Sequence, residues 1–96
     1  MKLEDVVVRN EKLIVDGVEN EIIIFNEETQ NTHILNETAG YLFDHAKKSK
    51  IGDIIDELYN ELAEEERCAH PKEEIIQDCI AILEEMISQG LLLLMK

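Results

Sequence analysis

The chain has 96 residues, 45% of them hydrophobic, which is enough for one compact domain expected to span residues 1–96. Nine Lys and Arg residues against 22 Asp and Glu residues give a formal net charge of −13, which opposes binding to nucleic acid or to an anionic membrane. The longest apolar run, Leu91–Met95, is too short to cross a bilayer, and no signal-peptide pattern follows Met1. These features predict a soluble cytoplasmic protein.

The first third of the chain is rich in β-branched residues and lacks helical periodicity. Val6–Val8 and Leu13–Val15 are short apolar runs, and Asp16-Gly17 is a turn signal before the strongest predicted strand, Glu21–Phe25. Thr32–Leu35 is expected to close a hairpin with that strand and to lie at a sheet edge, because it is shorter and more polar. We expect a small antiparallel sheet of about three N-terminal strands, with Glu21–Phe25 covered on both faces.

From Asn36 onward the apolar spacing becomes helical. Asn36 is a suitable N-cap for a first helix over Thr38–Lys48, in which Lys47 and Lys48 would complement the helix dipole. A second helix is predicted from Ile51 to Ala63. The acidic run Glu64–Glu66 is expected to end it or to form an exposed linker.

A third helix is predicted between Pro71, which suits a first turn, and Gly90, which suits a C-terminal cap. Leu91–Met95 then forms a final short strand or a packed tail. Strands followed by three helices indicate an α+β fold of the winged helix-turn-helix type.

The apolar residues of the third helix form two adjacent stripes on a helical wheel. One stripe holds Ile75, Cys79, Ile82 and Met86, and the other holds Ile76, Ile80, Leu83 and Ile87. Together they span roughly 160°, more than the roughly 100° that a surface helix needs to face one core. The second partner is either the protein's own sheet or tail, or an open groove beside the edge strand. Such a groove would suit an extended peptide.

Residues with catalytic or metal-binding chemistry are scattered. His33, His45 and His70 lie on separate elements, and Cys68 and Cys79 form no spaced pair. His33 is expected to face solvent, with peptide contact as its alternative, and Cys79 to act as a small hydrophobe. The sequence therefore predicts no enzyme activity, no cofactor and no metal site.

Three stretches resemble the PqqD family, also called RiPP precursor recognition elements. They are HILNETAGYLFDHA, IGDIIDELYNEL and DCIAILEEMISQGLL, and the resemblance covers about Glu21 to Leu94. It implies a non-catalytic winged-helix module that captures the leader region of a ribosomally synthesised precursor peptide by strand addition. The module would present that leader to a modifying enzyme, such as a radical SAM maturase or a leader peptidase.

The resemblance also implies the peptide-binding residues. The augmented strand would be Asn31, Thr32, His33, Ile34 and Leu35, and the helix wall would be Ile75, Asp78, Cys79, Ile82, Glu85 and Met86. Asp78 flanks the first stripe and favours it as the peptide-facing one, although Ile76, Ile80 and Ile87 are the alternative. Asp78 and Glu85 would form an acidic rim able to pair with Lys or Arg of a leader.

Two other functions fit the same elements. An acidic dimerising or inhibitory subunit could use the open strand edge to pair with itself as a homodimer. A winged-helix transcription regulator is less compatible, because the third helix carries acidic residues throughout and only Lys72 at its start.

Overall fold

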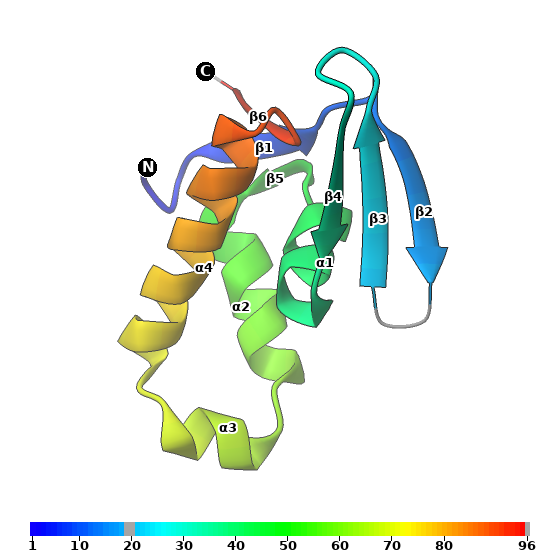
Figure 1. Cartoon of the computed structure of the whole chain (residues 1–96). Helices are drawn as coiled ribbons and strands as arrows, with labels where there is room; N and C mark the ends of the chain where they lie inside the picture. The colour runs from blue at the N-terminus through cyan, green and yellow to red at the C-terminus, as the bar shows by residue number, and fades with distance from the viewer. Residues whose placement is uncertain (19–20, 96) are drawn as a thin grey trace.

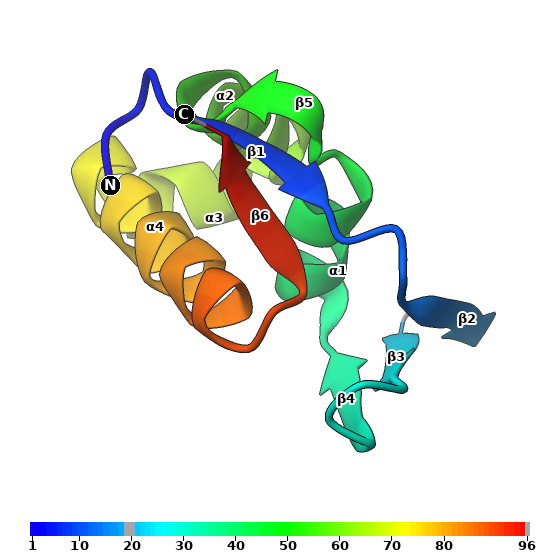
Figure 2. The same cartoon turned by 90° about the horizontal axis from the view of Figure 1, so that it is seen from above.

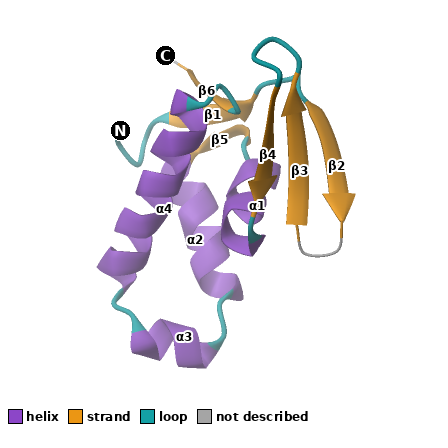
Figure 3. Ribbon diagram, viewed as in Figure 1, coloured by secondary structure: helices purple, strands orange, loops and turns teal. Residues whose placement is uncertain are grey.

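The computed structural model describes residues 1–18 and 21–95, and these residues form six strands and four helices (Figure 1). In chain order the elements are β1 (Val6–Arg9), β2 (Ile14–Val18), β3 (Glu21–Asn26), β4 (Asn31–Leu35), α1 (Glu37–Asp44), β5 (Lys47–Lys50), α2 (Ile51–Glu61), α3 (Glu64–Ala69), α4 (Lys72–Ser88) and β6 (Leu92–Met95). The predicted α+β class is confirmed, as the secondary-structure colouring of Figure 3 shows. None of the helices within these residues is long and apolar enough to span a membrane.

The described strands form two separate antiparallel sheets, each of three strands. One has the order β2-β3-β4 and is built from consecutive hairpins, as the sequence predicts. The other has the order β5-β1-β6, and its central strand pairs with segments far away in the chain. Seen from above, the second of these sheets covers the helices, while the hairpin sheet projects to one side (Figure 2). The predicted N-terminal sheet of about three strands is therefore confirmed as β2-β3-β4, whereas Val6–Val8 belongs to a second sheet that the sequence did not predict.

Helix α1 is shorter than predicted. Asn36 caps it as expected, because the Asn36 side-chain oxygen accepts a hydrogen bond of 2.9 Å from the backbone N–H of Ala39. The helix ends at Asp44, however, and Lys47–Lys50 forms β5 instead of a final helical turn. Pairing of β5 with β1 supplies backbone hydrogen bonds from outside the helix, so tertiary contact overrides the local helical pattern.

Helix α2 begins at Ile51 as predicted, and Gly52 in its first turn has a packing reason. The Gly52 N–H donates to the carbonyl of Leu3 at 2.9 Å, and a Cβ at position 52 would lie 3.3 Å from that carbonyl oxygen. The predicted linker Glu64–Glu66 is instead the first turn of the short helix α3, where three exposed carboxylates complement the helix dipole.

Helix α4 has the boundaries that the sequence predicts. Pro71 precedes it, and Gly90 follows it with a φ of +78°. The Leu91 N–H donates to the carbonyl of Met86 at 2.9 Å, and the Gly90 N–H donates to that of Ile87 at 3.1 Å. These two bonds define a Schellman motif, which turns the chain sharply into β6.

The core lies where α1, α2 and α4 meet one face of each sheet. Ile24 and Leu35 of the hairpin sheet are buried in it, and Ile22 packs against it. Ile23 and Phe25 lie on the opposite face and are only half-buried, so the prediction that both faces of β3 are covered is wrong. Asp16-Gly17 is not a turn, because it pairs with Ile23 and Ile22 inside β2.

Candidate functional site

A groove of about 400 Å³ lies between β4 and α4. Its lining residues are Thr32, His33, Ile34 and Leu35 of β4, Asn36 and Ala39 at the start of α1, and Ile82, Glu85, Met86 and Gln89 of α4. Among the described strands β4 pairs with β3 alone, so its other edge carries unpaired backbone groups. An open strand edge therefore forms one wall of the groove and an amphipathic helix forms the other.

The helix wall is apolar at its base and polar at its rim. Met86 is only 2% exposed and Ile82 is half-buried, whereas Glu85 and Gln89 are exposed. The Gln89 side-chain amide donates to the Glu85 carboxylate at 3.5 Å, which links the two rim residues. Ile82 and Met86 belong to the first of the two predicted stripes, and no residue of the second stripe lines this groove.

His33 is not solvent-facing, contrary to the expectation from the sequence. It stands opposite Ile24 in the β3–β4 register, so its side chain lies on the covered face of the sheet and is half-buried. Its Nε2 atom is buried without a hydrogen-bond partner among the described residues. A buried polar atom without a hydrogen-bond partner lowers the stability of the folded state by about 1–3 kcal/mol, unless a bound group supplies the missing hydrogen bond.

Ile75, Asp78 and Cys79 lie beside a second hollow of about 240 Å³ rather than in the groove. Thr38 of α1, Leu58 and Leu62 near the end of α2, and Glu66 and His70 complete its lining. Ala39 lines the groove and its neighbour Thr38 lines the second hollow. The start of α1 therefore lies between the groove and the second hollow. The predicted helix wall is therefore divided into two parts.

The remaining predicted residue, Asn31, begins β4 opposite Asn26 and lines neither hollow. The groove also contains Ala39, which the sequence reasoning missed, and Gln89, which ends the predicted helix wall but was not named as a contact. Ala39 could have been found from its place one turn after the edge strand, and Gln89 from its position one turn after Glu85.

Within residues 1–18 and 21–95, no three His, Cys, Asp or Glu side chains gather closely enough to hold a metal ion. Each of the other histidines has a local partner: His45 stacks on Tyr41 at 3.9 Å, and His70 lies 3.2 Å from the Glu74 carboxylate. Burial, with a smaller contribution from Asp78, raises the pKa of the Cys79 thiol from 9.0 to about 11. Cys79 is therefore a neutral thiol near pH 7 and a poor nucleophile.

Fold and groove together define a class of protein: a small α+β module that presents an open strand edge beside an apolar helix. The family model described as "Coenzyme PQQ synthesis protein D (PqqD)" matches residues 21–92, and the chain belongs to this family. Among curated proteins, no sequence relative matches the chain. A similar solved structure is "TbiB1 in Complex with the TbiA(beta) Leader Peptide", with a TM-score of 0.75 and 11% identity over 90% of this chain and 94% of that one.

Proposed function

We propose that this chain is a non-catalytic module that captures the leader of a ribosomally synthesised precursor peptide. The leader adds to β4 as a further antiparallel strand and is presented to a modifying enzyme. The observation that carries this proposal is the unpaired edge of β4, which runs along a groove whose opposite wall holds Ile82 and Met86. Membership of the PqqD family, and a leader peptide bound to a protein of the same fold, support it.

Strand addition explains both affinity and selection. Main-chain hydrogen bonds to β4 contribute about 1 kcal/mol each and depend little on leader sequence. Side chains on one face of the added strand point towards Ile82 and Met86, where burying one large apolar side chain contributes about 1.5–3 kcal/mol. The leader is therefore expected to carry aliphatic or aromatic residues at alternate positions.

Two polar features of the groove add selectivity. The buried Nε2 atom of His33 can form its missing hydrogen bond with a polar group of the leader. The exposed Glu85 carboxylate on the rim favours a Lys or Arg in the leader, although an exposed pair contributes at most about 1 kcal/mol and acts mainly on the association rate.

The leader can also continue past the start of α1. In that case Ile75 and Asp78 are further contacts in the second hollow, while Cys79, only 2% exposed, shapes the floor. A radical SAM maturase or a leader peptidase would then receive the free part of the precursor.

An NMR titration of the isotope-labelled chain tests this function. The probe is the leader peptide encoded beside the gene of this chain, with a scrambled leader as control. We expect saturable shifts at Thr32–Asn36 and Ile82–Gln89 with the encoded leader only. Shifts elsewhere, or equal shifts with the scrambled peptide, contradict strand addition at β4.

A pair of variants on α4 sharpens the test. Ile82→Glu places a charge in the apolar base of the groove, and we expect it to weaken leader binding at least about tenfold. Ala81→Glu introduces the same charge at a neighbouring exposed position and should leave affinity unchanged. Circular dichroism establishes that both variants are folded, and equal affinities would remove Ile82 from the site.

A homodimer is a second candidate, and it has an observation of its own. Ile14 is 52% exposed and Ile34 is 66% exposed on the outer face of the hairpin sheet, where they flank Phe25 and Ile23. Analytical ultracentrifugation with and without the leader separates the two functions. A dimer that the leader dissociates would mean that both compete for β4, whereas a leader-independent dimer would place self-association on the outer face.

A further inference from the structure

Basic residues are concentrated in one place on this acidic chain. Three of the nine Lys and Arg residues lie within the four positions of β5, at Lys47, Lys48 and Lys50. Among the described residues none of these lysines forms an ion pair, whereas Lys12 pairs with Glu28 at 3.6 Å and Lys72 with Asp56 at 3.5 Å. The β5 lysines therefore leave a locally positive surface on a chain whose net charge is −13.

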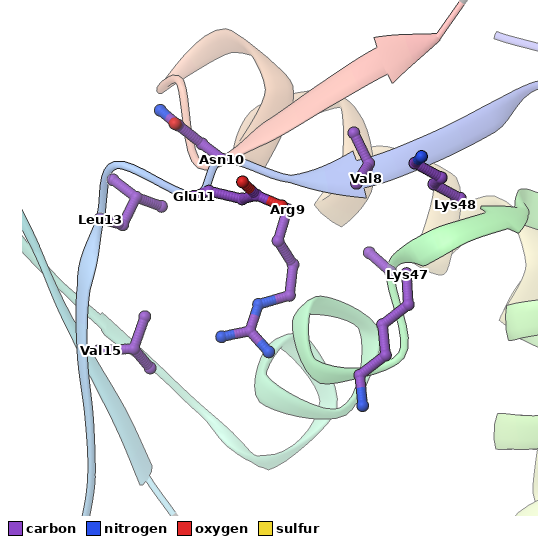
Figure 4. Close-up of a pocket in the computed structure, with 9 residues that line it drawn as sticks. Val8, Arg9, Asn10, Glu11, Leu13, Val15, Lys47 and Lys48 are labelled. Carbon is purple, nitrogen blue, oxygen red and sulfur yellow. The ribbon is translucent and has the colours of Figure 1, made fainter.

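A hollow of about 460 Å³ opens beside this surface, between the two sheets and the C-terminal end of α1 (Figure 4). It is lined by Val8, Arg9, Asn10, Glu11, Leu13, Val15, Ala46, Lys47 and Lys48. Val8, Leu13 and Val15 give it an apolar wall. Three of its lining residues are cations and one, Glu11, is an anion, so we call it the basic hollow.

Arg9 is held in place inside the basic hollow. Its guanidinium lies 4.6 Å from the centre of the Phe43 ring and 3.7 Å from the Asp44 carboxylate, and its side chain is still 32% exposed. The distance to Asp44 is long for an ion pair, so N–H donors of the guanidinium remain free for another acceptor. A fixed guanidinium suits a carboxylate, which it can bind through two parallel hydrogen bonds.

Backbone strain accompanies the two lysines at the rim. The β1–β5 register skips a residue, because Val7 stands opposite Ser49 and Val8 opposite Lys47. Lys48 is the extra residue. Its φ of +57° is a left-handed backbone conformation that is unfavourable for most residues other than glycine. This bulge allows both Lys47 and Lys48 to line the hollow. Lysines on a regular edge strand would block edge pairing without needing a bulge.

We propose that the basic hollow is a second docking site, which binds an acidic segment of a partner protein. Asp and Glu side chains of the partner pair separately with Arg9, Lys47 and Lys48, and an adjacent aliphatic side chain packs against Leu13 and Val15. The basic hollow shares no lining residue with the groove beside β4, so both can be occupied together. That the partner is the modifying enzyme rests on the proposed function; the site itself does not.

The test is an NMR titration of the labelled full chain with a short capped peptide of alternating leucine and glutamate. Its leucine–glutamine analogue is the uncharged control, and inorganic phosphate is a second probe. We expect saturable shifts at residues 8–15 and 46–48 with the glutamate peptide, weakening as salt is raised. Equal binding of the glutamine analogue would overturn the charge-based site, and binding of phosphate without the peptide would reassign it to a phosphate ligand.

Charge-matched variants complete the design. Lys47→Glu combined with Lys48→Glu should weaken binding of the glutamate peptide by about tenfold or more. Lys2→Glu combined with Lys72→Glu makes the same change in net charge outside both the hollow and β5, and should leave the affinity within about twofold. Equal losses in both double variants would mean that only the overall charge matters and would overturn the proposal.

Leader binding measured on the same samples separates the two proposals. A variant with Lys47→Glu and Lys48→Glu that still binds the leader is folded, so its loss of the glutamate peptide is specific to the basic hollow. Failure of the leader to bind any sample would overturn the proposed function alone.

Discussion

Two edge strands of this molecule, β5 in one sheet and β4 in the other, differ in how readily they could pair with a further strand. The edge strand β5 carries three lysines and a bulge, which oppose the addition of another strand. The edge strand β4 has the sequence NTHIL, with neither Lys nor Pro, and it borders an open groove. One edge is therefore protected against pairing and the other is left available for it.

The sheets also differ in how they are tied to the rest of the chain. The hairpin sheet β2-β3-β4 is formed by neighbouring segments, whereas β1 joins β5 and β6 from the middle and the end of the chain. A sheet built from distant segments holds the whole fold together, and a local hairpin can accept a further strand without rearranging the core. This division agrees with the binding site proposed on the hairpin sheet.

The largest expected effect concerns the sheet that joins the chain ends. Leu92 is fully buried, and Leu92→Ala should lower the free energy of unfolding by about 3 kcal/mol because it leaves a cavity. Ile34→Ala on the hairpin sheet removes a side chain that is 66% exposed and should cost less than about 1 kcal/mol. Urea unfolding of both variants measures the difference. Similar losses would mean that the outer face of the hairpin sheet is packed as closely as the core.

Local signals in the sequence were sufficient for the elements that depend on local chemistry. Asn36 and Gly90 mark helix ends because a side-chain acceptor and a left-handed backbone are needed at those points. The segment Lys47–Lys50 gave no such signal, since a lysine-rich tetrapeptide has little strand propensity. It becomes a strand only through its distant partner β1, which no periodicity reveals.

The groove could be predicted in outline. The edge strand and the Ile82–Met86 side of α4 do lie on two walls of one groove. The wheel could not show that the start of α1 divides the helix wall, so Ile75 and Asp78 lie beside a separate hollow. The basic hollow was not predictable from the sequence. It brings Arg9 close to Lys47 through the pairing of β1 with β5, and no local pattern in the sequence indicates that pairing.

The next effect concerns the buried thiol of Cys79, which lies beside the second hollow and not in the groove. Because the folded state raises the pKa of Cys79 from 9.0 to about 11, it holds the thiol proton more tightly than the unfolded chain. The resulting stability is fully present below pH 9.0 and is lost as the pH rises to about 11, by roughly 2–3 kcal/mol. Thermal unfolding of the wild type and Cys79→Ala across this range measures it.

Tyr41, whose pKa is also raised, first by burial and then by Glu61 and Glu57, titrates in both proteins. Only the excess loss of stability in the wild type is therefore due to Cys79. Parallel curves for wild type and Cys79→Ala would show that the thiol is not desolvated. Rapid labelling of Cys68 alone in the native state would provide independent support, because Cys68 is exposed and Cys79 is buried.

A proline scan of β4 tests the open edge directly. The N–H groups of His33 and Ile34 point to opposite sides of the strand, so one of them bonds to β3 and the other faces the groove side. Proline at the residue whose N–H bonds to β3 should destabilise the sheet. Proline at the residue whose N–H faces the groove should leave the fold intact and weaken leader binding about tenfold. Calorimetric titration of both variants is the measurement. Wild-type affinity in both would rule out strand addition at β4.

The smallest effect separates two roles of Asn36, which caps α1 and also lines the groove. Asn36→Ala should cost about 1 kcal/mol of stability, because the Ala39 N–H loses its acceptor. Asn36→Asp keeps that acceptor and should retain the stability, but it removes the amide donor and adds a negative charge to the groove. If a leader accepts a hydrogen bond from the Asn36 amide, the Asp variant will bind it several-fold more weakly at unchanged stability. Equal leader affinity of wild type and Asn36→Asp would leave Asn36 as a helix cap alone.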